Sequence, residues 1–581
     1  MGWLYHFVDL TAEQKHERRE LLDYYGAIAQ LSILIPLLIL QSYHVSAWLH
    51  RRWRSQAGFD VPSSPRAKRE QSARTRFNIT HLATALRRLQ WWCGDPCTIL
   101  GINLGTNGEA ITTLAWSAWL LTLCFLQTGD DYLHLTKRFG TVASSQLPLH
   151  YLLALKSPFS PLQILTRCSH ETLNSSHQLL GRLITGLLYL HAALYINFYV
   201  ISSLLAAKVQ EVYVLCGIFG IVAFTVVATT SLGPLRRWSY RVFYITHVVL
   251  ATALLPVLFF HVSHIRMYLY ETAAIYALNV VLRSVTSHKI PGTLRLIAGT
   301  NLLEVTIPLG KQYDALRKWE PGQHAYVSKS GRPLLRTFRS NPFTVASLPG
   351  TDGHLRFIAR LLDGNTAKLA QAAAQAKTSC MLTVEGPYGL RTHAEALLRY
   401  DKVVFVAGGV GGTFTVPLYR QLLADLSPGR GSYRRQKVSF LWVVRSKDDM
   451  SWALPAEEKE RQGFVERLKV CVTGGGVIAS ATSQDYVPSN GGAGEEGIEL
   501  DEHKGLLDDD VGEAATEGVP TFAGRPDLVK LMDQVFAGDS SETVAIVVCG
   551  PRRLSQAVRQ GVGPWVVRGR SVWLWDESFA Y

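Results

Sequence analysis

The chain has 581 residues, 48% of them hydrophobic, and a formal net charge of +13 at pH 7. This length exceeds what one hydrophobic core supports, so two or three domains are expected. The basic excess does not indicate nucleic-acid binding, because no basic and aromatic recognition module is present and much of the excess lies between residues 51 and 88, directly after an apolar stretch. Membrane lipid is therefore the expected partner, and nucleic acid is not.

Seven stretches are long and apolar enough to predict membrane-spanning helices. They cover about 24–48, 108–128, 140–156, 177–201, 210–231, 240–263 and 265–285. The third stretch is the weakest, because it is short and contains Gln146, Pro148 and His150. Basic loops usually mark the cytoplasmic side, which places the C-terminal half in the cytoplasm. We therefore expect a multi-pass membrane protein.

Four histidines within these stretches form two pairs with equal spacing. His177 and His191 lie on the fourth stretch, His247 and His261 lie on the sixth, and each pair is separated by 14 positions. At about 100° and 1.5 Å per residue, the two members of a pair share a helix face and lie roughly 21 Å apart. If the two helices run in the same direction, His177 faces His247 and His191 faces His261. Such a set would hold two b-type haems, each between two imidazoles.

Packed or interfacial histidines are the alternative interpretation, although a histidine in lipid is costly unless it has a role. Two pairs with identical spacing argue against this alternative. His44, His150 and His264 lie near the membrane without a partner at a matching spacing, and we interpret them as interfacial.

After about residue 290 short β-like runs alternate with helical stretches. A Pro-Phe-Thr turn offers a backbone edge and a hydroxyl to a flavin ring. Downstream, an arginine and a glycine-containing loop could hold a pyrophosphate by charge and by backbone N–H groups. The candidate flavin residues are Pro342, Phe343 and Thr344, and the candidate phosphate residues are Arg360, Gly364 and Thr366.

A buried-strand pattern at 403–407 opens into a glycine-rich turn at 408–413. A strand, such a turn and a helix N-terminus form a phosphate site, because the amides converge and the helix dipole favours an anion. A tight structural turn is the alternative. Further strands at 438–444 and 544–548 predict a doubly wound sheet. The candidate nucleotide residues are Gly408, Gly409, Gly411, Thr413 and Arg445; Arg445 could bind a 2′-phosphate, which favours NADPH over NADH.

These motifs together resemble the fungal ferric/cupric reductases, within the larger group that includes the NADPH oxidases. The resemblance covers roughly residues 107–581 without an acidic segment at about 474–520, which we expect to be a disordered insert. It rests on the histidine pairs, the Asn-Pro-Phe-Thr and Cys-Gly-Pro segments, the glycine turn and the terminal Glu-Ser-Phe-Ala-Tyr. Asn341 stands where the family usually has His, and Tyr581 where Trp is common.

The resemblance implies a multidomain fold. Residues 1–106 would form an N-terminal tail, a first transmembrane helix and a basic cytoplasmic loop, and residues 107–288 an α-helical transmembrane haem domain. Residues 289–398 would form a β-barrel FAD domain like that of ferredoxin reductases, and residues 399–581 an α/β NADPH-binding domain.

The implied activity is electron transfer from NADPH, through FAD and two haem b groups, to ferric or cupric chelates outside the cytoplasm. In such a protein Gly409, Gly411, Thr413, Cys549 and Gly550 would line the nicotinamide site. Phe579 and Tyr581 would cover the flavin until NADPH displaces them. The plasma membrane is the expected location, and a metal permease is a conceivable partner.

Two other functions stay open. A superoxide-producing NADPH oxidase has the same architecture, but its second histidine pair is typically one residue closer than the pair found here. A catalytically inactive regulatory membrane protein is the third hypothesis, and the intact histidine pairs and nucleotide motifs argue against it.

Overall fold

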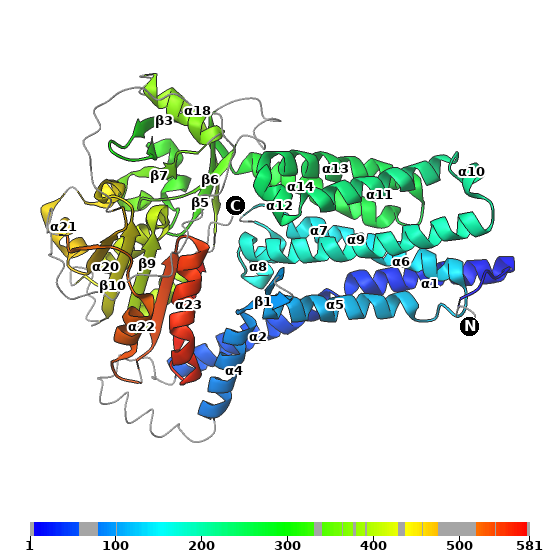
Figure 1. Cartoon of the computed structure of the whole chain (residues 1–581), viewed down its shortest axis with the longest axis horizontal. Coiled ribbons are helices and arrows are strands. Elements are labelled where there is room, and N and C mark those ends of the chain that lie inside the picture. The colour runs from blue at the N-terminus through cyan, green and yellow to red at the C-terminus, as the bar shows by residue number, and fades with distance from the viewer. Residues whose placement is uncertain are drawn as a thin grey trace. The chain divides into compact units, whose positions relative to one another are not determined.

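The computed structural model describes residues 5–56, 79–99, 102–157, 159–329, 340–362, 364–375, 379–389, 392–427, 436–455, 457–474, 519–540 and 542–577. Phe579, Tyr581, most of the basic loop and residues 475–518 of the acidic segment lie outside these ranges. The chain divides into two compact units, Met1–Thr286 and Ser287–Tyr581. Figure 1 shows that the first unit is built mainly of helices and that the second contains the large sheets.

Five helical stretches in the described part of the first unit are long and apolar enough to cross a membrane: Ala12–Ser46, Asn107–Phe125, Thr172–Ile201, Val212–Thr230 and Tyr240–His261. Their outward side chains are apolar, as the bilayer requires; Leu114 and Val212, for example, are 72% and 69% exposed. The predicted multi-pass membrane character is confirmed. The elements of this unit are α1 (Ala12–Leu31), α2 (Leu34–Gln56), α4 (Ile79–Cys93), β1 (Pro96–Ile99), β2 (Ile102–Thr106), α5 (Asn107–Phe125), α6 (Tyr132–Ser145), α7 (Leu147–Leu153), α8 (Pro161–Thr166), α9 (His170–Ile201), α10 (Leu205–Lys208), α11 (Val212–Thr230), α12 (Gly233–Trp238), α13 (Tyr240–His261) and α14 (Arg266–Val285).

Two of the seven predicted spans have no counterpart among the described helices that are long and apolar enough to cross a membrane. The stretch at 140–156 is divided between α6 and α7, and Pro148 lies in the first turn of α7. Proline fits the first turn of a helix, where its missing N–H is not needed, so a new helix begins there. The stretch at 265–285 is one helix, α14, but it is not among the helices that are apolar enough to span a membrane.

The second unit contains two six-stranded sheets. The first is antiparallel, with the order β6-β5-β8-β3-β4-β7. Its buried alternate residues, such as Val305, Ile307 and Phe357, form one core. This is the predicted barrel-like FAD domain. Its strands are β3 (Ser287–Leu296), β4 (Leu302–Pro308), β5 (His324–Lys329), β6 (Asn341–Thr344), β7 (His354–Arg360) and β8 (Cys380–Tyr388), with helices α17 (Pro349–Asp352) and α18 (Asn365–Ala374).

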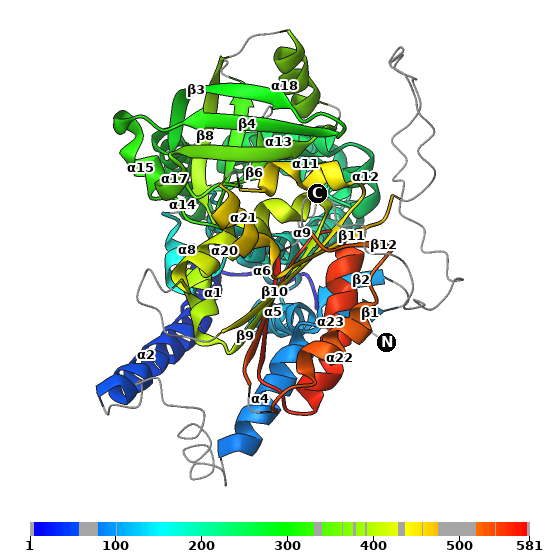
Figure 2. The ribbon, with the colours of Figure 1, turned by 90° about the vertical axis from the view of Figure 1, so that its left-hand side faces the viewer.

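The second sheet is parallel, with the order β12-β11-β10-β9-β13-β14. The connection from β9 to β10 runs toward one edge of the sheet, and the connection from β13 to β14 runs toward the other edge. Because such connections are right-handed, their helices lie on opposite faces of the sheet (Figures 1 and 2). This confirms the predicted α/β nucleotide-binding domain. Its elements are β9 (Lys402–Gly408), α20 (Gly412–Asp425), β10 (Lys437–Val444), α21 (Glu458–Val465), β11 (Leu468–Val472), β12 (Thr521–Ala523), α22 (Leu528–Phe536), β13 (Val544–Cys549), α23 (Arg552–Val567) and β14 (Val572–Glu577).

Candidate functional site

The four predicted histidine ligands lie in two facing pairs between α9 and α13. The ring centroids are 6.0 Å apart for His177 and His247 and 6.5 Å apart for His191 and His261. A metal–imidazole bond is about 2 Å long, so two rings bound to opposite sides of one ion have centroids about 6 Å apart. Both pairs therefore have the spacing of a two-histidine metal site.

Backbone carbonyl groups orient both rings of the pair His191 and His261. Nδ1 of His191 donates to the Thr136 carbonyl at 2.8 Å, and Nδ1 of His261 donates to the Tyr213 carbonyl at 2.6 Å. A carbonyl oxygen only accepts, so the proton of each neutral ring is on Nδ1 and the lone pair is on Nε2. This arrangement is typical of metal-binding histidines.

Two glycines allow these rings to lie close to the neighbouring helices. A Cβ on Gly140 would lie 2.7 Å from Cε1 and Nδ1 of His191, and a Cβ on Gly217 would lie 2.7 Å from Cε1 of His261. Each glycine follows by four positions the residue whose carbonyl accepts from that ring. One helical turn thus supplies the acceptor, and the next supplies the space for the ring.

The pair His177 and His247 is constructed differently. Nδ1 of His177 donates to the His150 carbonyl at 3.0 Å. Nδ1 of His247 is buried and has no hydrogen-bond partner among the described residues. His150, which the sequence analysis interprets as interfacial, lies against this pair, because its ring stacks on that of His177.

The donor set of each pair fits a haem. Within the described ranges, no group of three or more His, Cys, Asp or Glu side chains could hold a metal ion, so each pair offers only its two imidazoles. A haem iron takes only axial ligands from the protein. Two facing histidines therefore complete such a site, whereas a bare ion would lack ligands.

In the second unit, the predicted nucleotide residues come together at the carboxyl ends of β9 and β13. A Cβ on Gly411 would overlap the Cys549 carbonyl oxygen, and a Cβ on Gly550 would lie 3.0 Å from the Gly408 nitrogen. The glycines are therefore needed for the two strand ends to pack together. Ligands of open α/β sheets bind at this edge.

Gly409 occupies a different position within the same turn. It has a φ of +53°, and a Cβ added to it would meet no atom within 4 Å, so its outer side is open. Its carbonyl accepts a hydrogen bond from Nε1 of Trp442 at 3.0 Å. The buried Thr413 donates its hydroxyl to the Val410 carbonyl at 2.8 Å. Hydrogen bonds thus hold the turn on its inner side, and its outer side is open, as a phosphate or nicotinamide contact requires.

Arg445 directly follows β10 at the same edge of the sheet and is exposed. Its side chain is available to an anionic group of a nucleotide, and the predicted choice of NADPH over NADH remains a prediction.

The predicted flavin turn forms β6, which pairs with β5. Pro342 and Phe343 are partly buried, whereas Thr344 is buried. Tyr326 lies opposite Pro342 in the register, and its ring centroid lies 5.4 Å from that of Tyr388. Sequence reasoning did not identify Tyr326 and Tyr388 as neighbours of this turn. The alternation of buried and partly exposed residues within β5 was the signal that could have placed Tyr326 beside this turn.

The predicted phosphate residues lie around the beginning of α18. Arg360 ends β7 and is exposed, and Gly364, with a φ of +94°, is the N-cap of α18. The Thr366 hydroxyl accepts from the Leu362 N–H at 3.0 Å and donates to the Leu362 carbonyl at 2.6 Å. The hydroxyl therefore stabilises the loop, and the first-turn N–H groups are the donors suited to an anion.

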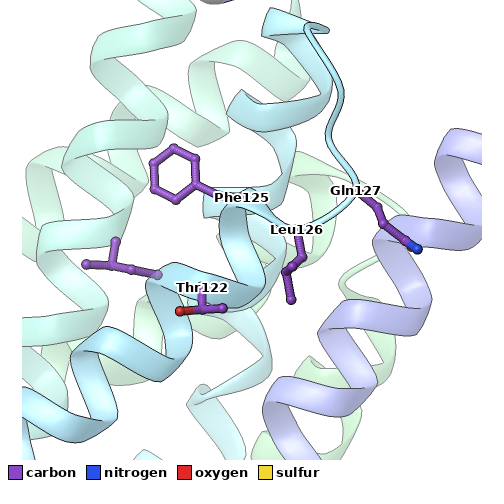
Figure 3. A pocket seen from close by; sticks show the side chains of 5 residues that line it. Thr122, Phe125, Leu126 and Gln127 are labelled. Carbon is purple, nitrogen blue, oxygen red and sulfur yellow. The ribbon is translucent and has the colours of Figure 1, made fainter.

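A hollow of about 440 Å³ lies at the C-terminal end of α5 (Figure 3). It is lined by Leu121, Thr122, Phe125, Leu126 and Gln127. Phe125 and Leu126 are 49% and 44% exposed, which is ordinary for a helix that faces lipid. None of these residues is a predicted ligand, so the hollow is not part of the candidate site.

Three families match successive parts of the chain. Residues 139–258 match the ferric reductase like transmembrane component, residues 291–392 match an FAD-binding domain, and residues 400–562 match the ferric reductase NAD binding domain. The first match contains His177, His191 and His247 and ends three positions before His261.

Similar proteins include a probable metalloreductase AIM14 of Meyerozyma guilliermondii, 24% identical over 75% of this chain and 83% of that protein. Ferric reductase transmembrane component 3 of Saccharomyces cerevisiae is 25% identical over 73% of this chain and 58% of its own length. Ferric/cupric reductase transmembrane component 2 of the same yeast is 24% identical over the same shares. The chain thus matches somewhat more than half the length of the two Saccharomyces proteins. The chain thus contains a ferric reductase like transmembrane component, followed by an FAD-binding domain and a ferric reductase NAD binding domain, which is the domain set of a membrane oxidoreductase.

Proposed function

We propose that this protein is a transmembrane metalloreductase of the plasma membrane. It takes electrons from cytosolic NADPH, conducts them through FAD and two b-type haems, and delivers them to ferric or cupric chelates on the other side of the membrane. The names of its relatives, as ferric and ferric/cupric reductases, support the choice of acceptor.

The observation that carries this proposal is the pair of facing histidine sites. Centroid separations of 6.0 and 6.5 Å and Nδ1–H groups held by carbonyl oxygens suit iron with two imidazole ligands. Two such ligands leave no open position on the metal, which favours electron transfer over binding of oxygen. The 14-residue separation along each helix corresponds to about 21 Å, so the two sites together cover much of a bilayer core of about 30 Å.

The residues around the cofactors have distinct tasks. The β9–α20 turn and the Cys549–Gly550 backbone would orient the nicotinamide, and the exposed Arg445 would bind the 2′-phosphate. The β6 turn would hold the flavin ring, and the N-terminus of α18 with Arg360 would hold its phosphates. Bound FAD would supply the change from hydride transfer to single-electron transfer, and bound haem the conduction of single electrons.

The relay is tested by removal of one ligand. His191→Ala should lower the haem b content of the purified protein from two to one per chain, because the one remaining imidazole, that of His261, would not hold a haem at this site. FAD should stay at the wild-type level, and ferric reduction driven by NADPH should fall to background. Metal reduction at the wild-type rate in this variant would contradict the relay.

The acceptor is tested by excluding oxygen. Membranes that contain the protein should form Fe(II) from a ferric chelate with NADPH under anaerobic conditions. If Fe(II) forms only in air, and superoxide forms with it, the protein is an NADPH oxidase instead.

A further inference from the structure

One histidine outside the two pairs lies against a predicted ligand. The ring of His150, on α7, stacks on the ring of His177, on α9, with a centroid distance of 3.9 Å and an interplanar angle of 8°. Stacking of this closeness requires the two rings to be nearly parallel. The same residue also accepts the His177 Nδ1–H through its backbone carbonyl, at 3.0 Å. His150 therefore restrains His177 twice, once at the edge of the ring and once across its face.

The surroundings of His150 keep it in this place. A Cβ on Gly181 would lie 2.9 Å from Cε1 of His150, so only glycine at this position leaves the ring its full room. Nδ1 of His150 is buried and makes no hydrogen bond within the described part of the chain. A hydrogen bond from Nδ1 to one of those residues therefore does not explain the position of the ring. Its stacking on His177 does explain it.

The next residue ties the same short helix to the other ligand-bearing helix. The Tyr151 hydroxyl donates to the Ala251 carbonyl on α13 at 2.7 Å, one helical turn after His247. Consecutive residues of α7 thus contact α9 and α13 beside the same histidine pair. The rings of the other pair lie instead against Gly140 and Gly217.

We infer that His150 is a positioning residue for the His177–His247 site and fixes the rotation of the His177 ring about its metal bond. This inference rests on the proposed function, because it assumes that a haem occupies the site. Partners that hold a ligating imidazole set its orientation and its basicity. The stacked ring restricts rotation, since turning the His177 plane would drive it into the His150 ring. Loss of the stack should therefore change the electronic properties of one haem and leave the other unchanged.

The first test compares two substitutions of the same residue in the purified full-length protein. His150→Ala removes the stacking ring but keeps the backbone carbonyl, whereas His150→Phe keeps a flat ring and removes the nitrogens. We expect His150→Ala to shift one of the two low-spin haem signals in electron paramagnetic resonance, together with one of the two midpoint potentials in a redox titration. His150→Phe should stay close to the wild type. Unchanged spectra and potentials in His150→Ala, or equal shifts in both variants, would overturn the inference.

The second test displaces the His150 ring without altering it. Gly181→Ala places a methyl group against the ring and should reproduce the His150→Ala shift. Gly186→Ala is the matched control, because it is the same change on the same helix at an exposed glycine with nothing within 4 Å of its Cβ position. Equal spectra for the two glycine variants would contradict the stacking role.

The two claims fail in different ways. Wild-type protein without haem b would contradict the proposed function, and the inference with it. Two haems in the wild type with no selective shift in the His150 and Gly181 variants would overturn the inference alone.

Discussion

At the pair His191 and His261, single atoms decide whether a ring fits between two helices. Gly217 leaves the space that the His261 ring occupies, and a methyl group there would lie 2.7 Å from Cε1 and 3.0 Å from Nδ1. The ring would have to move away from the Tyr213 carbonyl that orients it. The glycine in this apolar helix thus leaves room for the histidine ring of the neighbouring helix.

Gly217→Ala should therefore weaken one haem site. Overpacking a tight contact costs about 1–3 kcal/mol, which corresponds to about five- to 150-fold in haem affinity. The haem b content per chain should fall toward half, while FAD stays constant; a pyridine haemochrome assay and flavin fluorescence measure the two. Gly186→Ala, which meets nothing within 4 Å, should retain both haems. Full haem content in Gly217→Ala at limiting haem would show that the contact is not needed.

The four candidate ligands could be picked out from the sequence because their spacing is a property of single helices. The contacts of His150, Gly140 and Gly217 with the histidine rings could not be predicted, because they depend on which helices become neighbours. His150 lies 27 positions before the ring on which it stacks, and no periodicity connects the two. A glycine within a predicted span was a usable signal, but the ring that it accommodates was not readable from the sequence.

At the scale of elements, the turn from β9 to α20 shows how a strand end becomes a binding site. Trp442 holds the Gly409 carbonyl from the neighbouring strand β10, while the outer side of Gly409 is open. The motif was predicted as a phosphate or nicotinamide turn, with a purely structural turn as the alternative. The packing of Gly411 against Cys549 shows that part of the glycine content is structural, whereas the open side of Gly409 is not explained by packing.

Gly409→Trp should block use of the nucleotide and leave the haems in place. A large side chain would fill the open side of the turn, and the positive φ adds strain for any residue but glycine. Turnover with NADPH should fall to background, while dithionite still reduces both haems as in the wild type. Gly463→Trp, at an exposed glycine of α21 with open space around it, should retain turnover. Normal turnover in Gly409→Trp would assign the turn a structural role only.

The bounds of the membrane-spanning helices were predicted less exactly than those of the strands that carry the nucleotide motifs. The stretch at 140–156 is divided because the chain begins α7 at Leu147 with Pro148 in its first turn. Gln146, between the two helices, donates to the Ala29 carbonyl of α1 at 2.8 Å. This tertiary hydrogen bond stabilises the break, and hydropathy alone does not report it.

At the scale of the whole molecule, an ion pair joins the FAD-binding sheet to the nucleotide-binding sheet. Arg420 of α20 donates two hydrogen bonds, of 3.0 and 3.1 Å, to the Asp352 carboxylate at the end of α17. Burial alone would raise the pKa of Asp352, but the hydrogen bonds from Arg420 and the Leu348 N–H hold it below its usual value. The contact joins α17 and α20 through residues 68 positions apart. Sequence patterns do not predict a contact at this separation.

Asp352→Asn should destabilise the unit at neutral pH. A charge-assisted hydrogen bond contributes about 1.5–3 kcal/mol, and its loss should lower the midpoint of thermal flavin release. A carboxylate with a depressed pKa contributes its stabilisation above the pKa of the unfolded chain and loses it as the pH falls. The difference between wild type and variant in the midpoint temperature of flavin release should therefore be largest at pH 7 and shrink below about pH 5. The exposed Glu458, changed to Gln, is the control; a difference independent of pH would contradict the role of the ion pair.

Transfer of electrons from one side of the membrane to the other is the central claim, and sealed vesicles test it most directly. Purified protein is reconstituted with a ferric chelate and a membrane-impermeant Fe(II) indicator trapped inside, and NADPH is added outside in the absence of oxygen. We predict Fe(II) inside the vesicles, formed by those molecules whose nucleotide domain faces outward, and none with His191→Ala. Absence of Fe(II) from the lumen, with superoxide appearing once air is admitted, would contradict the account.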